Sequence, residues 1–481
     1  MNQFCPKPYK GFLIIALGLS IQSQLSAQTW TLKACIARAN DKNIALNQTK
    51  LSNDLNRITL DQSKYNLYPN LNLSDAQIFS FGRSLDPISY QYSNENISSN
   101  SPSLNSSVTL YSGLHNIYLI HENKLIYNAG SLDIEKQQND LDLSVLGAYM
   151  QVLLTYEALD IAKKQMEMTA AQVDRTEKFV NAGKVPELNL FQVQSQLATD
   201  KSAIVDAENS LQIAKVTLMQ LMELPITPNF EIEKPALEGV LTEASATSAE
   251  DVYNRALVLQ PQIKSAVMHS EAAQLDLKVS QSAIQPTLSM GGSLRTNYSS
   301  LRNEVSSQVI YEKENVGYVL GNPSQPVVGL VPTDVTTTSG YPIENQLKDN
   351  FNQAISFTLS VPLFNNYQVK YAIEKSKVSV QNAKLNEDAA SVQLRKVIEQ
   401  AYTDWAGAAK KLVAAEEQAK SEERTYGDME KKFTAGLATT TDYLVEKNNY
   451  TKSLLAKESA RYDYVYKTKV IDFYLGNPLT F

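Results

Sequence analysis

The sequence predicts a mainly α-helical chain with a smaller β part, formed by duplication of a unit that combines long helices with one β-hairpin. Three observations predict this fold. An internal repeat runs along the 481-residue chain, its helical stretches are long and free of proline, and extended segments recur at equivalent places in both halves. An internal repeat indicates that one structural unit is used twice.

Two constant sequence offsets define the repeat. Residues 38–69 and 255–286 each read as a helical stretch that ends at a proline, at an offset of 217. Residues 107–111 match residues 360–364 at an offset of 253, which then holds without a gap for more than a hundred residues. The difference of 36 residues indicates an insertion between residues 286 and 361, rich in Gly, Pro, Ser and Thr. A polar insertion of this kind predicts a longer surface loop.

Each half contains a long apolar stripe with spacings of three and four. The first stripe consists of Val145, Ala148, Val152, Thr155, Leu159, Ala162, Met166, Thr169, Val173, Thr176 and Val180. Shifting it by 253 gives a second stripe over residues 398–433, in which only Glu422 is charged. Such a stripe is the seam of packed, supercoiling helices, and it fits an ordinary coiled coil equally well. Because no proline interrupts it, a helix from about His115 to Val180 would span on the order of 100 Å.

Both long helices lead into a glycine, Gly183 or Gly436, which predicts a left-handed C-cap at each end. A second helix then returns over about residues 187–223 and 440–475. We therefore expect one helical hairpin in each half.

Four extended segments lie between the helices, at residues 71–81, 104–110, 288–294 and 355–363. Their alternation of apolar and small polar residues suits membrane barrel strands, and equally a soluble hairpin packed on one face. Four strands from one chain leave two open edges, which lipid does not tolerate, and the smallest usual membrane barrels have about eight strands. If these strands lie in a membrane, two or more chains must share the barrel.

The N-terminus reads as a secretory signal peptide. Lys7 and Lys10 precede an apolar run over residues 11–21, and residues 25–27 offer a small-residue cleavage site. The run is too short to span a bilayer, and no later stretch approaches about 18 apolar residues. We expect the protein to leave the cytoplasm.

These features define the domain organisation that the sequence predicts. It comprises a signal peptide (1–27), a first repeat (28–225, hairpin about 70–112), an inter-repeat linker (226–250), and a second repeat (251–481, hairpin about 286–364). The first hairpin loop is expected at residues 93–107, and the second, a long external loop, at about residues 298–350.

Composition and motifs argue against several functions. The formal charge is −7, or −9 without the two lysines of the signal peptide, whereas nucleic-acid binding requires clustered Lys and Arg. Cys5 and Cys35 permit no disulfide within the mature chain, and Cys35 reads as a small apolar residue on a helix. His115, His121 and His269 lack metal-ligand spacing, and no phosphate-binding loop or nucleophile elbow occurs. We expect neither an enzyme nor a bound cofactor or metal.

The order of these parts resembles the TolC-like outer membrane factor family of efflux and secretion channels. The resemblance rests on the duplication, on strands that begin after a proline, and on the turn over residues 433–442. That turn is similar to the family's helix-tip pattern of an aromatic residue, Gly-Leu and a Thr-Asp pair. Residues 30–32, Trp-Thr-Leu before a helix, resemble the family's mature N-terminus. The resemblance covers essentially the whole mature chain.

The resemblance implies a homotrimer with a twelve-stranded barrel in outer-membrane lipid and a long α-helical barrel in the periplasm. It also implies helix tips that dock on a periplasmic adaptor protein, which connects the duct to an inner-membrane transporter. The function it implies is the outer-membrane exit duct of a tripartite efflux or type I secretion system. Such a duct passively conducts small molecules or polypeptide to the outside, and the transporter supplies the energy.

The resemblance also implies site residues. An acidic ring at the pore entrance falls on Asp442, with Glu446 beside its second position, and the first-repeat equivalent of Asp442 is Asn189. An ordinary acidic residue in the first turn of a helix explains Asp442 equally well. Adaptor docking is expected at the tip residues Gly183, Lys184, Val185, Gly436, Leu437 and Ala438. A basic residue that locks the closed state in some members corresponds to Ala438 here, so the gate is expected to differ.

A secreted or surface coiled-coil scaffold or adhesin without a pore is the alternative hypothesis. It explains the stripes and the loops. It gives no role to four extended segments that occupy equivalent places in both halves.

Overall fold

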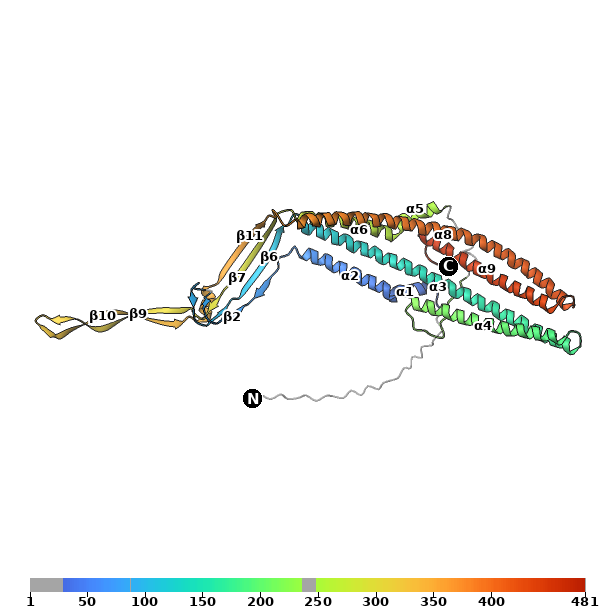
Figure 1. The fold of residues 1–481 in the computed structure, drawn as a ribbon, viewed down its shortest axis with the longest axis horizontal. Helices are drawn as coiled ribbons and strands as arrows, with labels where there is room; N and C mark the ends of the chain where they lie inside the picture. The colour runs from blue at the N-terminus through green and yellow to red at the C-terminus, as the bar shows by residue number, and fades with distance from the viewer. Residues whose placement is uncertain (1–28, 87, 236–247, 481) are drawn as a thin grey trace, which may run out of the picture. The chain divides into compact units, whose positions relative to one another are not determined.

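The computed structural model describes residues 29–86, 88–235 and 248–480, shown as a ribbon in Figure 1. The predicted signal peptide and residues 236–247 of the predicted linker lie outside the described residues. The chain divides into two compact units. Of the described residues, the first unit comprises 29–47, 137–235, 248–259 and 394–480, and the second comprises 48–86, 88–136 and 260–393.

Four long helices preserve the duplication without any shift. They are α3 (His115–Asn181), α4 (Glu187–Leu221), α8 (Gln368–Thr434) and α9 (Thr440–Tyr474). The first and last residues of α8 and α9 lie 253 positions after those of α3 and α4, as the sequence offset predicts. Every position of both apolar stripes is buried or half-buried, so the stripes are packing faces.

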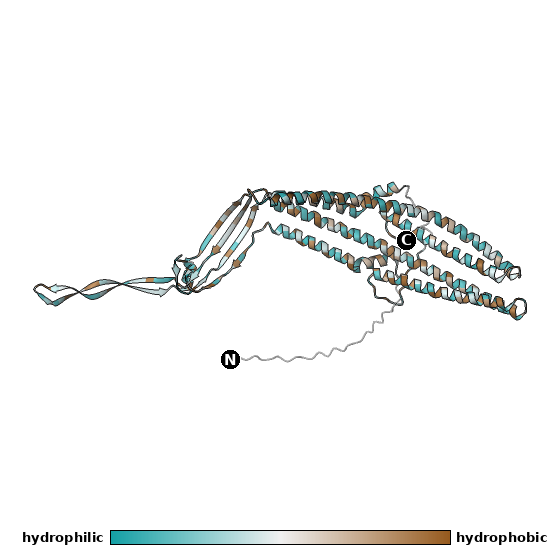
Figure 2. Ribbon diagram, in the orientation of Figure 1, coloured by the Kyte–Doolittle hydropathy of each residue, from teal (hydrophilic) through white to brown (hydrophobic). Residues whose placement is uncertain are grey.

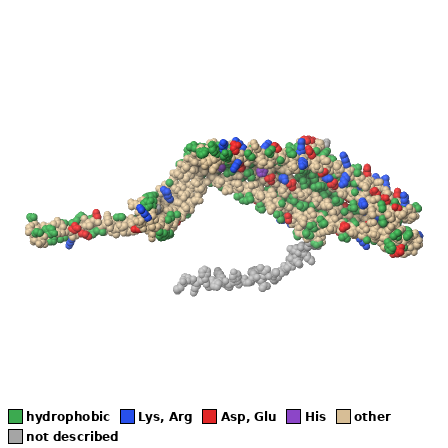
Figure 3. All heavy atoms as spheres, viewed as in Figure 1, with side chains coloured by type: hydrophobic (Ala, Val, Ile, Leu, Met, Phe, Trp, Pro, Cys, Tyr) green, Lys and Arg blue, Asp and Glu red, His purple; other side chains and the backbone are tan. Residues whose placement is uncertain are grey.

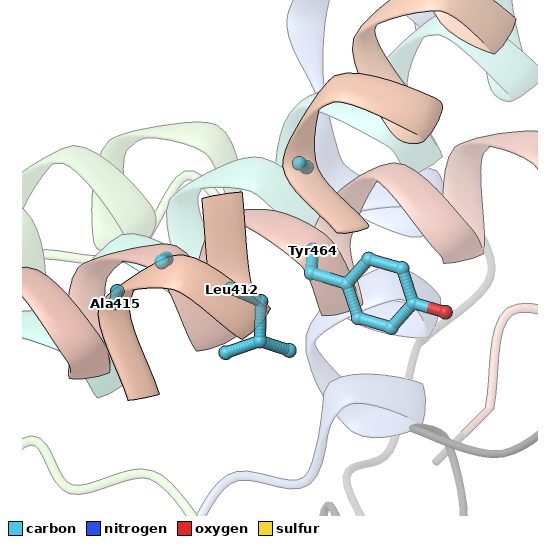
Figure 4. Close-up of a cluster of buried hydrophobic side chains, with 5 residues drawn as sticks. Leu412, Ala415 and Tyr464 are labelled. Carbon is cyan, nitrogen blue, oxygen red and sulfur yellow. The ribbon is translucent and has the colours of Figure 1, made fainter. Parts of the chain in front are cut away.

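The hairpin of α8 and α9 is held by a small apolar core in the first unit. Leu412 and Ala415 of α8 pack on Tyr464 of α9, which is 8% exposed (Figure 4). Trp405 packs against this cluster, and its indole N–H donates to the Thr468 hydroxyl over 3.2 Å. The alanines of the stripe let the two helices approach closely, and the aromatic rings fill the remaining space.

The shorter helices correct one prediction. Residues 38–69 and 255–286 were expected to be continuous helices, but each is broken into two. The first half has α1 (Leu32–Lys42) and α2 (Ile44–Tyr65), and the second has α5 (Ala249–Leu259) and α6 (Pro261–Ser282).

The two helix breaks occupy equivalent positions and have local causes. They fall at Asn43 and Gln260, which are 217 positions apart and have extended ψ angles of 126° and 125°. Gln260 precedes Pro261, and a residue before proline is disfavoured in the helical region. Asn43 instead caps α2, because its side chain accepts from the amide of Leu46 over 3.1 Å.

The main sheet lies in the second unit and contains four antiparallel strands. In sheet order these are β1 (Asn72–Ser74), β6 (Ser103–Tyr111), β7 (Thr287–Arg295) and β11 (Asn352–Ser360) (Figure 1). The first-repeat hairpin supplies β1 and β6, and the second-repeat hairpin supplies β7 and β11. The two edges of the sheet are β1 and β11.

The first hairpin differs from the prediction in two ways. The strand expected over residues 71–81 ends at Ser74, and β2 (Gln77–Ser80) joins a separate sheet with β5 (Ile97–Asn100) and β8 (Tyr298–Ser299). The loop expected at residues 93–107 contains β5 and the beginning of β6. A short pair, β3 (Ser84–Leu85) and β4 (Tyr92–Ser93), lies at its tip. Alternation of apolar and polar residues marks extended chain but does not identify the partner strand.

The 36-residue insertion was expected to be a loop, and this expectation was wrong. The segment that carries it, predicted as a loop at about residues 298–350, contains a long two-stranded ribbon, β9 (Asn303–Val319) and β10 (Asn322–Gly340), followed by the short helix α7 (Ile343–Asp349). Gly321, with a φ of +86°, lies in the turn between the strands, a conformation that glycine adopts readily. The Val and Thr residues of both strands favour extended chain.

Candidate functional site

The main sheet has one apolar face and one polar face. Val108, Met290 and Phe357 are register partners on β6, β7 and β11, so their side chains point to the same side. The same side also carries Leu73, Leu104, Leu288, Leu294, Ile355 and Leu359. The opposite side carries Asn72, Asn105, Ser107, Thr109, Ser289, Ser293, Ser356 and Thr358. Figure 2 shows the resulting alternation along these strands.

The apolar face of the sheet is exposed in a single chain. Ile355 is 77% exposed and Phe357 is 66% exposed. Arg295, on the polar face, is the one charged residue of the four strands. In Figure 3 charged side chains are frequent over the helices and occur on the β9–β10 ribbon, whereas the strands of the main sheet show few. A continuous exposed apolar face across several strands marks an interaction with lipid or with another apolar surface.

None of the described helices has the length and apolar composition that crossing a membrane requires.

The glycine caps at the ends of α3 and α8 are confirmed. Gly183 and Gly436 have φ angles of +70° and +75°. The amide of Lys184 donates to the carbonyl of Phe179, and the amide of Leu437 donates to that of Lys432, each over 2.8 Å. These are the bonds of a Schellman motif, in which a left-handed residue satisfies the free carbonyls at a helix end. Both hairpins therefore turn at the same position of the repeat.

The two tips differ at the residue that begins the returning helix. Thr439 caps α9 in a capping box with Asp442: its hydroxyl accepts from the Asp442 amide over 3.1 Å and lies 2.7 Å from the Asp442 carboxylate. The equivalent residue in the first tip is Pro186, which gives α4 no side-chain cap. The second tip is therefore held by side chains, and the first by the fixed φ of proline.

The structure places the predicted entrance residues next to these tips. Asp442 is exposed in the first turn of α9, and Glu446 is half-buried one turn later on the same helix. Asn189 is half-buried in the first turn of α4. Of the tip residues, Gly183, Lys184, Gly436 and Leu437 are exposed, and Val185 and Ala438 are half-buried.

An apolar groove runs between α4 and α9 beside the tips. It has a volume of about 430 Å³ and is lined by Leu188, Phe191, Gln192, Ser195, Thr441, Leu444, Val445 and Asn448. Leu188, Phe191 and Val445 are each at least half exposed. The predicted docking residues do not include this groove, although Leu188 and Phe191 follow the first tip directly in the sequence.

An aromatic stack joins α8 to α9 near the second tip. Phe433 stacks on Tyr443 with ring centroids 4.7 Å apart, and Tyr426 stacks on Tyr450 at 5.4 Å. The hydroxyls of Tyr426 and Tyr443 are hydrogen-bonded at 3.1 Å, and burial raises the pKa of both. The sequence stripe contains Tyr426 and Phe433 but did not reveal their partners on α9. The equivalent first-repeat residues are Val173, Val180, Leu190 and Leu197.

A buried lysine joins the two hairpins within the first unit. Lys447 of α9 has no exposed surface, and its ammonium lies 3.6 Å from the carboxylate of Asp200 on α4. It also donates to the carbonyl of Gln165 over 3.0 Å and to the hydroxyl of Thr169, both on α3. Burial lowers the pKa of Lys447 to about 8, and Asp200 opposes this shift.

Sequence reasoning missed the buried lysine. The available signal is its spacing, because Lys447 lies four residues after Tyr443 and three before Tyr450, in phase with the apolar face of α9. A lysine in that phase indicates a buried ion pair.

A family profile described as outer membrane efflux protein matches residues 35–223 and 252–477. The pyoverdine export outer membrane protein OpmQ of Pseudomonas putida is 26% identical over 165 residues. That match covers 34% of this chain and 34% of OpmQ, so it spans about a third of the curated relative.

Solved structures of outer membrane proteins share the fold. VceC of Vibrio cholerae has a TM-score of 0.72 at 14% identity, over 93% of this chain and 96% of VceC. The CmeC channel of Campylobacter jejuni has a TM-score of 0.68 at 17% identity, over 92% of this chain and 85% of CmeC. The open MtrE channel of Neisseria gonorrhoeae has a TM-score of 0.65 at 16% identity, over 93% of this chain and 89% of MtrE.

The profile match spans both halves of the repeat, and the fold is shared over almost the whole described chain. The resemblance that the sequence suggested is therefore confirmed, together with the outer-membrane location. The chain belongs to the outer membrane efflux protein family.

Proposed function

We propose that several copies of this chain form an exit duct through the outer membrane, extending into the periplasm. The observation that carries the proposal is the main sheet, whose one face is apolar and whose other face is Ser-, Thr- and Asn-rich. A barrel strand in lipid has this alternation, with apolar residues facing the acyl chains and polar residues facing the aqueous interior. The efflux family and the export protein OpmQ support transport as the activity.

The duct is a homotrimer. A four-stranded sheet with the edges β1 and β11 cannot stand in lipid, because its edge N–H and C=O groups would lack partners. Three chains, with β11 of each paired to β1 of the next, give a closed barrel of twelve strands, well above the minimum of about eight. The helices of the first unit then form the periplasmic part of the duct.

The helix tips bind a periplasmic adaptor protein, which connects the duct to an inner-membrane transporter. The exposed residues of both turns and the apolar groove between α4 and α9 support this role. Leu188, Phe191 and Val445 offer an apolar surface that a helix of the adaptor could cover. The docking surface comprises Gly183, Lys184, Val185, Gly436, Leu437 and Ala438 together with this groove.

The entrance of the duct is lined by Asp442, Glu446 and Asn189. The exposure of Asp442, and the position of Glu446 one turn later on the same helix, support the proposal. Threefold repetition would bring three carboxylates of each kind toward one axis, where they attract cations. The capping box does not conflict with this role, because Asp442 remains exposed while it caps α9.

Cell fractionation and particle mass test the proposal. The full-length protein should be found in the outer-membrane fraction and should require detergent for extraction. Native mass spectrometry of the purified protein should give the mass of three mature chains. A water-soluble monomer in the periplasm would contradict the duct and would favour a scaffold without a pore.

A further inference from the structure

The contact between the two hairpins of one chain has a defined polar centre. We name the set Lys447, Asp200, Thr169 and Gln165 the lysine node. Lys447 enters from α9 and reaches between α3 and α4, where the other three residues are at most 6% exposed. Gln196 also donates to the Asp200 carboxylate over 2.7 Å. The node shows how a second-repeat helix inserts a long polar side chain into a first-repeat hairpin.

The repeat places a residue equivalent to each member of the lysine node on the other hairpin. The helix bounds of the two hairpins differ by 253 throughout, so positions 253 apart occupy the same place on their hairpins. Lys447 then corresponds to Gln194 on α4, and Asp200 corresponds to Ser453 on α9. Thr169 and Gln165 correspond to Glu422 and Gln418 on α8. We name these four residues, Gln194, Ser453, Glu422 and Gln418, the glutamine node.

The two sets differ in charge at the two positions that would contact each other. Lys447 and Asp200 are both buried and require each other, because either charge alone is costly in a dry interface. Where the first set has the cation Lys447 and the anion Asp200, the second has the neutral Gln194 and the neutral Ser453. Both charges are replaced together, which indicates that position 194 approaches position 453 as 447 approaches 200.

The two sets also differ in how far their side chains are exposed to solvent. Lys447 and Thr169 have no exposed surface, and Gln165 is 6% exposed. In contrast, Gln194 and Gln418 are exposed and Glu422 is half-buried, and only Ser453, at 2% exposed, is buried. Within one chain three of the four residues of the glutamine node therefore have exposed surface, although they lie at positions that are buried in the other hairpin. A contact with a second copy would cover Gln194 and Gln418.

We propose that Gln194 of one chain inserts between α8 and α9 of the neighbouring copy and donates its amide N–H to Glu422 there. This inference rests on the trimer proposed above. In a ring of three chains each second-repeat hairpin lies between two first-repeat hairpins, its own and that of the next copy. The lysine node joins the first pair, and the glutamine node joins the second.

The proposal explains Glu422, the one charged residue in the second apolar stripe. Its counterpart Thr169 accepts from the Lys447 ammonium. A neutral Gln194 is a weaker donor than an ammonium, and a carboxylate acceptor strengthens the bond. The ring thus has two kinds of seam, with a buried ion pair within each chain and a Gln–Glu contact between chains.

Cross-linking of the full-length protein tests the inference. Q194C/E422C carries one new thiol on each side of the proposed contact, and both sites have exposed surface in the single chain. Treated with a short bifunctional maleimide in detergent, it should give covalent dimers and trimers. The matched control is R175C/T434C, whose exposed parent side chains are hydrogen-bonded at 3.2 Å within one chain and which should link inside the chain without forming a dimer or trimer. Each single variant and the parent, whose Cys35 is buried, should give no linked oligomer.

A charge variant tests the same contact without a cross-linker. Gln194→Lys should place an ammonium beside Glu422 and raise the temperature at which the trimer dissociates. The same substitution combined with Glu422→Gln should lose that increase. An increase that persists in the double variant would show that position 194 does not face Glu422.

The outcomes distinguish this inference from the proposed trimer. A particle with the mass of one chain would overturn the trimer and this contact together. A trimer in which R175C/T434C links but Q194C/E422C gives only single chains would overturn the contact alone.

Discussion

The ammonium of Lys447 lies 3.6 Å from the carboxylate of Asp200, and both side chains are buried between the two helical hairpins of the chain. Two charges removed from water are tolerated only while they remain paired and hydrogen-bonded. The pair therefore fixes which residues of α9 face α3 and α4, because any sliding of α9 would separate the charges.

Removing one member of this pair is expected to destabilise the hairpin contact. Lys447→Met leaves Asp200 buried without its cation, at a cost of about 3–5 kcal/mol. Thermal unfolding of the purified protein should show a lower midpoint. Lys447→Met combined with Asp200→Asn should recover most of the loss, because no charge remains buried.

A surface pair is the matched control for this prediction. Lys431 and Asp428 lie 3.1 Å apart, but their side chains are 81% and 71% exposed. Lys431→Met should leave the midpoint almost unchanged, since exposed pairs contribute little. Equal effects of Lys431→Met and Lys447→Met would contradict the importance of the buried pair.

The two faces of the main sheet should respond differently to the same charge. Phe357→Arg places a guanidinium on the apolar face, where arginine near the bilayer centre costs about 2–4 kcal/mol. Thr358→Arg, one residue later, places it on the polar face. The amount of trimer in the outer membrane, measured on semi-native gels, should fall sharply for Phe357→Arg and little for Thr358→Arg. Equal losses would contradict the assignment of the faces.

Glu122 on α3 should make stability depend on pH. One of its carboxylate oxygens is buried without a hydrogen-bond partner, and burial, with Asp276 nearby, raises its pKa from 4.5 to about 7. The unfolded chain loses this proton first, so the free energy of unfolding should fall as pH rises from about 4.5 to about 7 and then stay level.

Glu122→Gln isolates this contribution, because the amide keeps the shape and cannot ionise. Thermal midpoints measured between pH 4.5 and 8.5 should decline less steeply for the variant, and the variant should be the more stable of the two at pH 8. A parallel decline in both proteins would show that Glu122 is not the group responsible.

Asp442 should contribute to the ion selectivity of the duct. Asp442→Asn removes the charge and keeps an oxygen that can accept from the Thr439 amide, so the start of α9 should be preserved. The reversal potential in a salt gradient should shift toward lower cation selectivity. Asp428→Asn, an exposed position on α8, is the control. An unchanged reversal potential for Asp442→Asn would remove this residue from the entrance.

The sequence predicted the parts of the fold that depend on local chemistry. Proline spacing and the glycine caps gave the two long helices, and α3 extends one residue past the predicted end at Val180. The 3-4 stripe identified the packing face. The helix break at Gln260 could also have been predicted, because Pro261 follows it. The apolar periodicity continues across the break and therefore suggested one helix.

The parts that were missed depend on distant partners. The ribbon of β9 and β10 is stabilised by pairing along its length, and its polar composition suggested a loop. Lys447 lies in phase with the apolar face of α9, but its partners on α3 and α4 cannot be identified until those helices are placed around it. The entrance residues stay predictions, because an acidic ring requires more than one chain.

Electrical recording on the purified protein in a planar lipid bilayer tests the central claim most directly. A duct of three chains should insert and give discrete conductance steps of uniform size, and Phe357→Arg should reduce the frequency of insertion without changing the step size. Purified trimer that is present in the bilayer and gives no conductance steps, with or without a voltage applied from either side, would contradict the account.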